Sequence, residues 1–517
     1  MDKPVKLRLN RKDDMASSGK RHDFEVKYTV GFNKKGKIKG LDITLLSNAG
    51  NVCDLSAPVM SRALTHLDNC YSFKDFTARG YICKTNTVSN TAFRGFGGPQ
   101  GMLAIETILE RVSRFLGIDL DALRRENYYS AKNGIKTPYG QIVKNIKIEK
   151  IINEMETFAG LEKRKLLVEK FNTSQINKNQ PYRKGIAFMP AKFGISFNKV
   201  SLNQAGALVH VYTDGSVRLN HGGTEMGQGL FIKVAQVVSE CFNIPIDYIH
   251  ISGTNTDEVP NTSATAASSG SDINGMAAWK AATVIKQRML KHASKVFKKP
   301  PSSIEFKNGL ILSGNKSMTF KELAFSCWEN RISLSSTGFY KTPKISWDQE
   351  KFKGSPYFYF TWGAAVSEAI IDIDTGESRI LRADIIQDCG SSLNPLIDRG
   401  QIEGGFIQGI GWLTCEELYF NPEGKLLTLG PSTYKIPGSR DVPPEFNIKL
   451  LENTPNEEKT IFRSKAVGEP PLLLSISHFL ALKNAVSMAS ETSNADLLNA
   501  PATPSKILAA VHNDHSM

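Results

Sequence analysis

The chain has 517 residues, of which 41% are hydrophobic and 22% are charged. This is ordinary globular composition, and the length is enough for two or more sizeable cores. No apolar run approaches the roughly 20 residues that span a bilayer, and the start, Met1-Asp2-Lys3-Pro4, contains no apolar signal core. These features argue against a membrane protein and give no support for export. We expect a cytoplasmic location, with the peroxisome as the alternative.

Seven cysteines are scattered singly, without a CxxC pair. A disulfide framework, a zinc cluster and an iron–sulfur cluster are therefore not expected, and a reducing compartment fits best. The formal net charge is +13, but the basic residues gather near the start and between 144 and 184, without interleaved aromatic side chains that would stack bases. We interpret this charge as a solvated basic surface rather than a nucleic-acid site.

The first half of the chain contains two predicted strands, 23–32 and 37–47, joined by a glycine-containing turn. Apolar residues at helical spacing then predict a helix over 99–115, which a proline opens and a glycine ends. The charged stretch 161–183 is interpreted as a loose connection between two domains.

The second half begins with a hairpin pattern at 205–220, followed by helical spacing of apolar residues from 230 to 241. Two further strands are predicted at 365–374 and 378–387, and a last helix from about 470 to 490. Because strands and helices are intermixed without regular βαβ alternation, the sequence predicts an α+β fold.

Three loops of glycines or small residues are candidate ligand sites. Residues 92–100 embed Arg94 among glycines before a helix, which suits an anion, although a tight turn around a core phenylalanine explains the pattern too. Residues 221–229 lie at a strand-to-helix junction, where four glycines and Gln228 favour close approach of a ligand over the alternative of a simple tight turn. Residues 261–270 offer small hydroxyl side chains, with a flexible surface loop as the alternative.

A fourth candidate is the stretch 465–471, in which Glu469 precedes two prolines and an apolar helix. The prolines fix the backbone, and a carboxylate at a helix N-terminus is favoured in its charged form, as a general base requires. The alternative is a glutamate that only caps the helix.

These four stretches together resemble the molybdenum-binding part of the xanthine dehydrogenase and aldehyde oxidase family. The similar runs are 89–100, 202–217, 221–230 and 464–472, in the family's order, with weaker similarity at 391–395 and 430–437. The resemblance implies two elongated mixed domains that enclose a molybdopterin cofactor at their interface. We expect residues 1–160 to be the remainder of the first domain, 161–183 the connection, and 184–517 the second domain.

The resemblance also implies roles for individual residues. Glu469 corresponds to the family's catalytic base. The molybdenum is held by the pterin dithiolene, without a direct protein ligand, and Arg94 and Ala267 form its surroundings. The full set of implied cofactor contacts is Arg94, Met226, Gly227, Gln228, Ala266, Ala267 and Gln401.

Substrate choice is implied by other positions. Arg62 matches the arginine of the xanthine-oxidising branch, which would neutralise charge on a purine carbonyl oxygen. Phe96 and Phe197 match the aromatic pair that brackets a flat ring, whereas Asn198 departs from the threonine of many xanthine enzymes. We expect oxidation of hypoxanthine to xanthine and of xanthine to urate; the alternatives are an aldehyde or N-heterocycle oxidase.

The chain starts after the place where the family has a further cofactor loop and its FAD and [2Fe–2S] domains. We therefore expect it to be the C-terminal catalytic portion of a longer homodimeric enzyme, with these cofactors on N-terminal parts or partner chains and with NAD or dioxygen as final acceptor. A subunit of a split enzyme and a truncated copy without catalysis are the alternatives.

Overall fold

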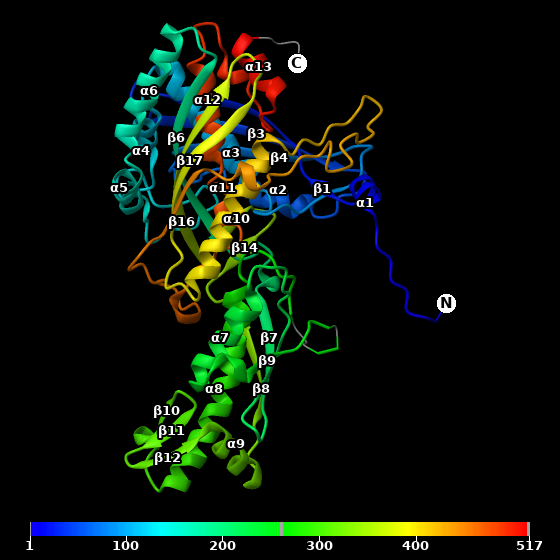
Figure 1. Ribbon diagram of the computed structural model, residues 1–517, viewed down its shortest axis with the longest axis vertical. Helices are drawn as coiled ribbons and strands as arrows, with labels where there is room; N and C mark the ends of the chain where they lie inside the picture. Colours follow the sequence, from blue (N-terminus) through cyan, green and yellow to red (C-terminus); the bar gives the residue numbers. More distant parts are fainter. Residues whose placement is uncertain (1, 256, 259–261, 514–517) are drawn as a thin grey trace.

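The computed structural model describes residues 2–255, 257–258 and 262–513 and shows a larger and a smaller lobe (Figure 1). The smaller lobe surrounds a core that runs from Ala205 to Tyr340. The two other cores lie in the larger lobe, which also carries both ends of the described chain. None of the described helices combines the length and the apolar character that crossing a membrane requires.

A mixed four-stranded sheet forms the centre of the larger lobe, in the order β18-β17-β16-β6. Its strands are β6 (Tyr182–Ile195), β16 (Tyr359–Asp372), β17 (Ser378–Gln387) and β18 (Glu445–Leu450). Along β16, Ala365 and Ala369 point into one core, while Ala364 and Val366 point into the other. Because both faces are covered, β16 and β6 are almost continuous apolar runs.

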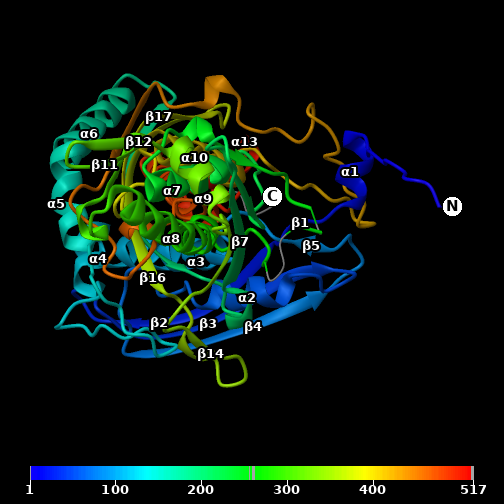
Figure 2. The same ribbon diagram turned by 90° about the horizontal axis from the view of Figure 1, so that it is seen from below.

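Helices cover one face of this sheet, and a second sheet with further helices covers the other. The first layer contains α10 (Pro395–Thr414), α11 (Pro470–Leu473), α12 (Ile476–Ser487) and α13 (Pro504–His512). The second layer contains α2 (Ser56–Leu64), α3 (Gly98–Leu116), α4 (Leu120–Asn127), α5 (Ile148–Ala159) and α6 (Leu161–Asn177). Its sheet pairs β2 (Phe24–Phe32), β3 (Ile38–Gly50) and β4 (Asp75–Lys84), which lie side by side in Figure 2.

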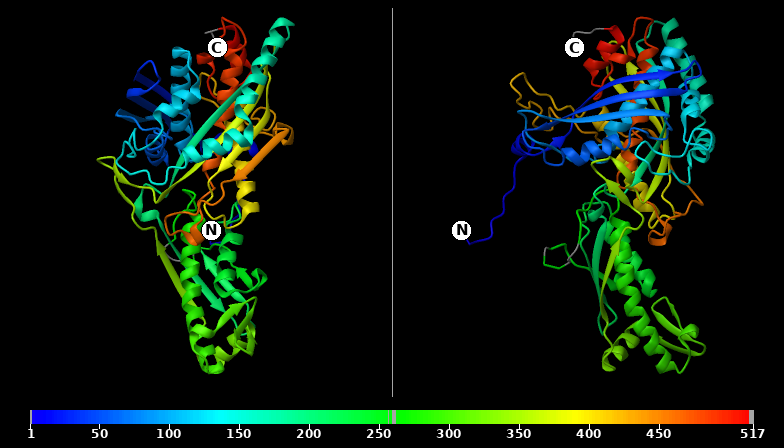
Figure 3. Two further views of the ribbon diagram at one scale, coloured as in Figure 1. Left: turned by 90° about the vertical axis from the view of Figure 1, so that its left-hand side faces the viewer. Right: turned by 180° about the vertical axis from the view of Figure 1, so that it is seen from behind.

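The smaller lobe packs two helices, α7 (Leu230–Phe242) and α8 (Gly270–Phe297), on a sheet of order β13-β7-β8-β9. The strands are β7 (Gln204–Val211), β8 (Val217–His221), β9 (Ile249–Ile251) and β13 (Ser335–Lys341). Helix α8 has 28 residues and extends along the lobe (Figure 3). At its far end lie β10 (Glu305–Lys307), β11 (Leu310–Ser313), β12 (Lys316–Thr319) and α9 (Phe320–Glu329).

The remaining α-helices and strands are short. They are α1 (Arg11–Ser17), β1 (Lys20–Arg21), β5 (Asn90–Thr91), β14 (Ser346–Asp348) and β15 (Lys353–Ser355). Strands β1 and β5 pair in parallel, and β14 and β15 pair antiparallel.

The predicted α+β class is confirmed, and so are most predicted elements. The first strand pair is β2 and β3, the first helix is α3, the hairpin is β7 with β8, and α7 follows it. The strands predicted at 365–374 and 378–387 correspond to β16, which already begins at Tyr359, and β17.

Two predicted elements differ from the structure. The stretch 161–183 is not loose, because its larger part forms α6, which buries Leu161 and Val168 in the same core as β6. The helix predicted over 470–490 is divided into α11 and α12 at Leu474 and Ser475. The assignment of 1–160 and 184–517 to two cofactor-binding domains stays a prediction.

Candidate active site

Glu469 lies at the end of the segment 464–469, whose backbone forms hydrogen bonds with four different parts of the chain. The N–H of Lys465 donates to the carbonyl of Cys389 at 2.8 Å, and the N–H of Ala466 donates to the Tyr359 hydroxyl at 2.9 Å. The carbonyl of Gly468 accepts from Arg94 Nε at 2.6 Å, and the N–H of Glu469 donates to Ser268 Oγ at 2.9 Å. This segment is therefore closely fixed in position.

The carboxylate of Glu469 has contacts on one of its two oxygens. Oε2 accepts from Ser268 Oγ at 2.7 Å and lies 3.8 Å from Arg62 Nη2. Among the described residues, Oε1 has no hydrogen-bond donor. Glu469 occupies the N-cap position of α11, yet its side chain makes no capping hydrogen bond. The alternative of a purely capping glutamate is therefore not supported.

Arg62 extends from α2 and is almost fully buried, with 3% of its side chain exposed. Nη1 donates to the carbonyl of Ser196 at 2.9 Å and Nη2 to that of Gly194 at 2.6 Å. The guanidinium also lies over the rings of Phe193 and Tyr357, at 4.6 and 5.2 Å from their centres. Backbone carbonyls and aromatic faces stabilise the positive charge of Arg62 without neutralising it. The guanidinium therefore lies beside Glu469 as a cation.

Arg94 connects its own loop to α10 and to the segment of Glu469. Beyond its bond to Gly468, Nη1 donates to Gln408 Oε1 and Nη2 to Gln401 Oε1, each at 3.2 Å. Burial lowers the pKa of Arg94, and the charge of Glu469 opposes this. The loop fits closely against α2: a Cβ on Gly97, whose φ is +93°, would lie 2.1 Å from the carbonyl oxygen of Val59.

The turn before α8 holds two non-glycine residues in the left-handed region, Ala267 and Ser268, both with φ +56°. Such a conformation is unfavourable for L-residues by about 1 kcal/mol or more each. In this conformation the Ser268 hydroxyl points to Glu469. Of the two preceding residues, Ala267 is buried and Ala266 is exposed. Asn261, at the start of this predicted loop, lies outside the described residues.

The loop 221–229 is organised by the carboxylate of Glu225, which accepts hydrogen bonds from the backbone of Gly227, Gly229 and Phe231 at 2.8 to 3.0 Å. Burial acts to raise the pKa of Glu225, but these backbone N–H groups outweigh it and lower that pKa. The predicted contacts of this loop, Met226, Gly227 and Gln228, lie at a tip where Met226 is 65% exposed. Thr224 joins the tip to the turn before α8 by donating to Thr265 Oγ1 at 2.8 Å.

The predicted substrate residues other than Arg62 are placed less directly. Phe96 and Phe197 are both half-buried, and in the part of the chain that the structure describes their rings do not stack on each other. Asn198 Nδ2 lies 3.3 Å from Ser61 Oγ, and Asn198 Oδ1 is buried without a partner. This acceptor and the unpaired, buried Nε of Arg62 are orphaned polar atoms that a bound ligand would satisfy.

The structure thus brings Glu469, Arg62, Arg94 and Gln401 together. The tip at Met226 is connected to them indirectly, because Thr224 bonds to Thr265 in the turn before α8 and Ser268 of that turn bonds to Glu469. Two guanidinium groups lie near one carboxylate, so the net charge of this cluster is positive. Such a charge favours binding of an anionic group such as a phosphate or an oxo group. These residues fit a molybdopterin in this respect. Sequence reasoning singled out the hydroxyl-rich loop 261–270, which contains Ser268, but gave this serine no role of its own. It missed Gln408, Tyr359 and Asp272, because glutamine, tyrosine and aspartate in ordinary helix or strand sequence carry no pattern that marks a site.

Comparison with known families gives two matches to models described as molybdopterin cofactor-binding domain, over residues 1–128 and 155–443. The chain is 46% identical to a xanthine dehydrogenase/oxidase of Felis catus and 47% identical to one of Gallus gallus, over 98% of its own length. It is 44% identical to a xanthine dehydrogenase of Dictyostelium discoideum. The chain spans 36% of the length of each of these relatives.

Solved structures share the fold. A quinoline 2-oxidoreductase from Pseudomonas putida 86 superimposes with a TM-score of 0.82 at 19% identity, covering 97% of this chain and 64% of that chain. A Cu,Mo-CO dehydrogenase superimposes with a TM-score of 0.84 at 20% identity, covering 98% of this chain and 64% of that chain. At such identities the likeness concerns the fold alone.

Proposed function

Because the chain belongs to the molybdopterin cofactor-binding domain family, we propose that it is the catalytic part of a molybdenum-dependent purine hydroxylase. Its substrates are hypoxanthine and xanthine, and its products are xanthine and urate. The observation that carries this proposal is the buried guanidinium of Arg62, 3.8 Å from the carboxylate of Glu469. A base beside a fixed cation suits a reaction in which an attacking hydroxyl loses its proton to the base while negative charge develops on a carbonyl oxygen of the ring.

The cofactor would be held by Arg94, Gln401 and the turn at Ala266 and Ala267 on one side, and by the tip at Met226, Gly227 and Gln228 on the other. When bound, molybdopterin supplies a molybdenum centre that transfers oxygen from water and accepts two electrons. The positive charge of Arg94 and its fixed bonds to Gly468 and the α10 glutamines support this assignment.

Glu469 acts as the general base. Ser268 and Arg62 hold Oε2 in place. Oε1 is therefore the oxygen that receives the proton of the hydroxyl that attacks the purine. Arg62 then stabilises the negative charge on the purine carbonyl oxygen, and Phe96 and Phe197 bracket the flat ring. Asn198 Oδ1, without a partner in the described structure, accepts a hydrogen bond from a ring N–H.

We extend this proposal to the activity of the whole protein. Electrons pass to NAD or dioxygen through FAD and [2Fe–2S] clusters carried by other parts of the enzyme or by partner chains. The complete enzyme is a homodimer of the cytoplasm. These assignments rest on the similarity to xanthine dehydrogenase/oxidase relatives over the shared region.

The proposal is tested with Glu469→Ala, Glu469→Gln and Arg62→Met in cofactor-loaded enzyme purified from its natural host, assayed with xanthine and an aromatic aldehyde. Both Glu469 variants retain molybdenum and lose turnover by about 10²-fold or more on either substrate, since a positioned base contributes roughly 10²–10⁴. Arg62→Met lowers xanthine turnover much more than aldehyde turnover, because only the purine develops charge at that arginine.

Near-normal rates of the Glu469 variants would remove the base from the mechanism. Equal losses on xanthine and aldehyde in Arg62→Met, or a native preference for the aldehyde, would favour the aldehyde oxidase alternative instead.

A further inference from the structure

We propose that Tyr359 and Asp272 are positioning residues for Glu469: they fix the segment that carries this carboxylate to the first turn of α8. The proposal rests on the base role proposed above for Glu469. It adds a second link to the one that Ser268 makes from the same helix start.

The link consists of two consecutive hydrogen bonds. The N–H of Ala466 donates to Tyr359 Oη at 2.9 Å, and the Tyr359 hydroxyl donates to Asp272 Oδ2 at 2.7 Å. Tyr359 opens β16, with 6% of its surface exposed, and Asp272 lies in the first turn of α8, with 7% exposed. A single hydroxyl thus connects the central sheet, the base segment and the smaller lobe.

This arrangement determines the direction in which the hydroxyl points. The N–H of Ala466 can only donate, so it uses a lone pair of Tyr359 Oη, and the hydroxyl proton of Tyr359 is donated to Asp272 Oδ2. Hydrogen bonds in such a chain strengthen one another in a low-dielectric interior. Ala466 is thereby held three residues before Glu469, while Ser268 holds Glu469 itself.

Asp272 is an unfavourable residue for packing alone. Burial raises its pKa to about 7, although the Tyr359 hydroxyl and the charge of Lys233 act to lower it. Lys233 is paired with Asp398, and no ion pair between Lys233 and Asp272 is found in the part of the chain that the structure describes. An apolar side chain would avoid this desolvation. The carboxylate of Asp272 is explained by its role as the hydrogen-bond acceptor for the Tyr359 hydroxyl.

The chain contains a matched control for this link. Tyr129 donates to Asp68 Oδ2 at 2.6 Å, and burial raises the pKa of Asp68 just as it raises that of Asp272. Both residues are buried, and within the described structure neither forms a hydrogen bond or an ion pair with the segment 464–469. Tyr129→Phe therefore removes the same kind of hydrogen bond away from Glu469.

The test compares Tyr359→Phe, Asp272→Leu, Asp272→Asn and Tyr129→Phe in the purified holoenzyme. Amide hydrogen exchange of residues 464–469 is measured first, since it does not depend on turnover. We expect Tyr359→Phe and Asp272→Leu to accelerate exchange in this segment at least about fivefold, as loss of one hydrogen bond predicts. Asp272→Asn keeps an acceptor for Tyr359, so it restores protection, and Tyr129→Phe leaves the segment unchanged.

The second readout is steady-state kinetics with xanthine. Tyr359→Phe and Asp272→Leu lower kcat about tenfold with little change in KM, because a displaced base affects the proton transfer rather than substrate binding. Exchange in 464–469 that matches Tyr129→Phe would overturn the positioning role. If exchange changes as expected but Glu469→Gln keeps normal turnover, the link stands and the base assignment fails.

Discussion

Asp272 is the residue whose protonation can be followed most directly. Its pKa is raised by burial from 3.8 to about 7 in the folded protein, so the folded state binds this proton more tightly than the unfolded state. The contribution of protonated Asp272 to the free energy of unfolding is therefore fully present below the pKa of the unfolded state. It is lost as the pH rises through the pKa of the folded state. The groups that face it are Tyr359 from β16, Lys233 from α7 and Tyr340 from β13.

We expect Asp272→Asn to remove this loss. Urea unfolding at about pH 5 and about pH 8 should show the variant gaining stability relative to the parent at the higher pH, because asparagine cannot ionise. Parallel pH profiles for Asp272→Asn and the parent would contradict the raised pKa.

At the residue scale, several of the candidate site residues that the sequence predicts lie in unusual loops. Arg94, Glu469 and the left-handed turn at Ala267 all lie where glycines, prolines or small residues mark irregular backbone. Tyr359 could not be found in this way, because it lies in an apolar strand where an aromatic residue needs no further explanation. Its role depends on Asp272 and Ala466, which only the fold brings to it.

Helix α10 shows at the element scale why some helices escape prediction. It contains glycines at 400, 404, 405, 409 and 411, and glycine is unfavourable inside a helix by about 0.8–1.0 kcal/mol relative to alanine. The fold explains part of this composition. A Cβ on Gly409 would lie 2.1 Å from Ser475 Oγ and 2.5 Å from the carbonyl oxygen of Leu472, whereas a Cβ on Gly404 would meet nothing within 4 Å.

Alanine substitutions at these two positions should therefore have opposite effects. Gly404→Ala raises the free energy of unfolding by about 0.5–1 kcal/mol, because it restores helix propensity without a clash. Gly409→Ala lowers it by about 1–3 kcal/mol, because α10 must move away from α11. Denaturant unfolding of both variants measures this, and a stabilising Gly409→Ala would refute the close approach of the two helices.

Helix α6 was missed for a different reason. Leu161 and Val168 are buried, but Leu166 and Leu167 are more than half exposed, so apolar residues do not mark a single face. The periodicity on which helix prediction relies is therefore blurred. The strands β2, β3, β7 and β17 were predictable because their alternation or their turns are local features, whereas the packing partner that stabilises α6 lies in β6.

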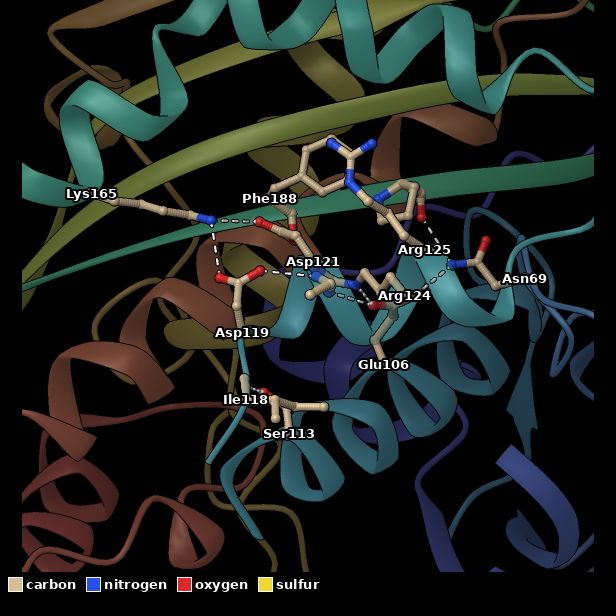
Figure 4. Close-up of polar contacts among 12 residues, drawn as sticks. Asn69, Glu106, Ser113, Ile118, Asp119, Asp121, Arg124, Arg125, Lys165 and Phe188 are labelled. Atoms are coloured by element: carbon tan, nitrogen blue, oxygen red, sulfur yellow. Dashed lines mark hydrogen bonds and ion pairs between the residues drawn. The ribbon is translucent and has the colours of Figure 1, made fainter. Parts of the chain in front are cut away.

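At the scale of the whole molecule, a buried ion pair and the hydrogen bonds around it join several elements of the larger lobe. Arg124 Nη2 lies 2.6 Å from Glu106 Oε2, and both side chains are 0% exposed. Arg124 Nη1 also donates to the carbonyl of Phe188 in β6 at 2.6 Å (Figure 4). Glu106 Oε1 accepts from Asn69 at 2.7 Å and from Tyr71 at 2.6 Å. This network connects α3, α4 and β6 with the segment that follows α2.

Breaking the network from one side should destabilise the whole lobe. Arg124→Met leaves the buried carboxylate of Glu106 uncompensated, which costs about 3–5 kcal/mol. The neighbouring Arg125→Met is the matched control, because its ion pair with Glu156 is about half exposed, with 51% and 46% of the side chains accessible, and such surface pairs contribute about 1 kcal/mol or less. Adding Glu106→Gln to Arg124→Met should recover part of the loss, since the buried group is then neutral. Equal destabilisation by Arg124→Met and Arg125→Met in calorimetry would show that burial of the pair does not determine the stability of this lobe.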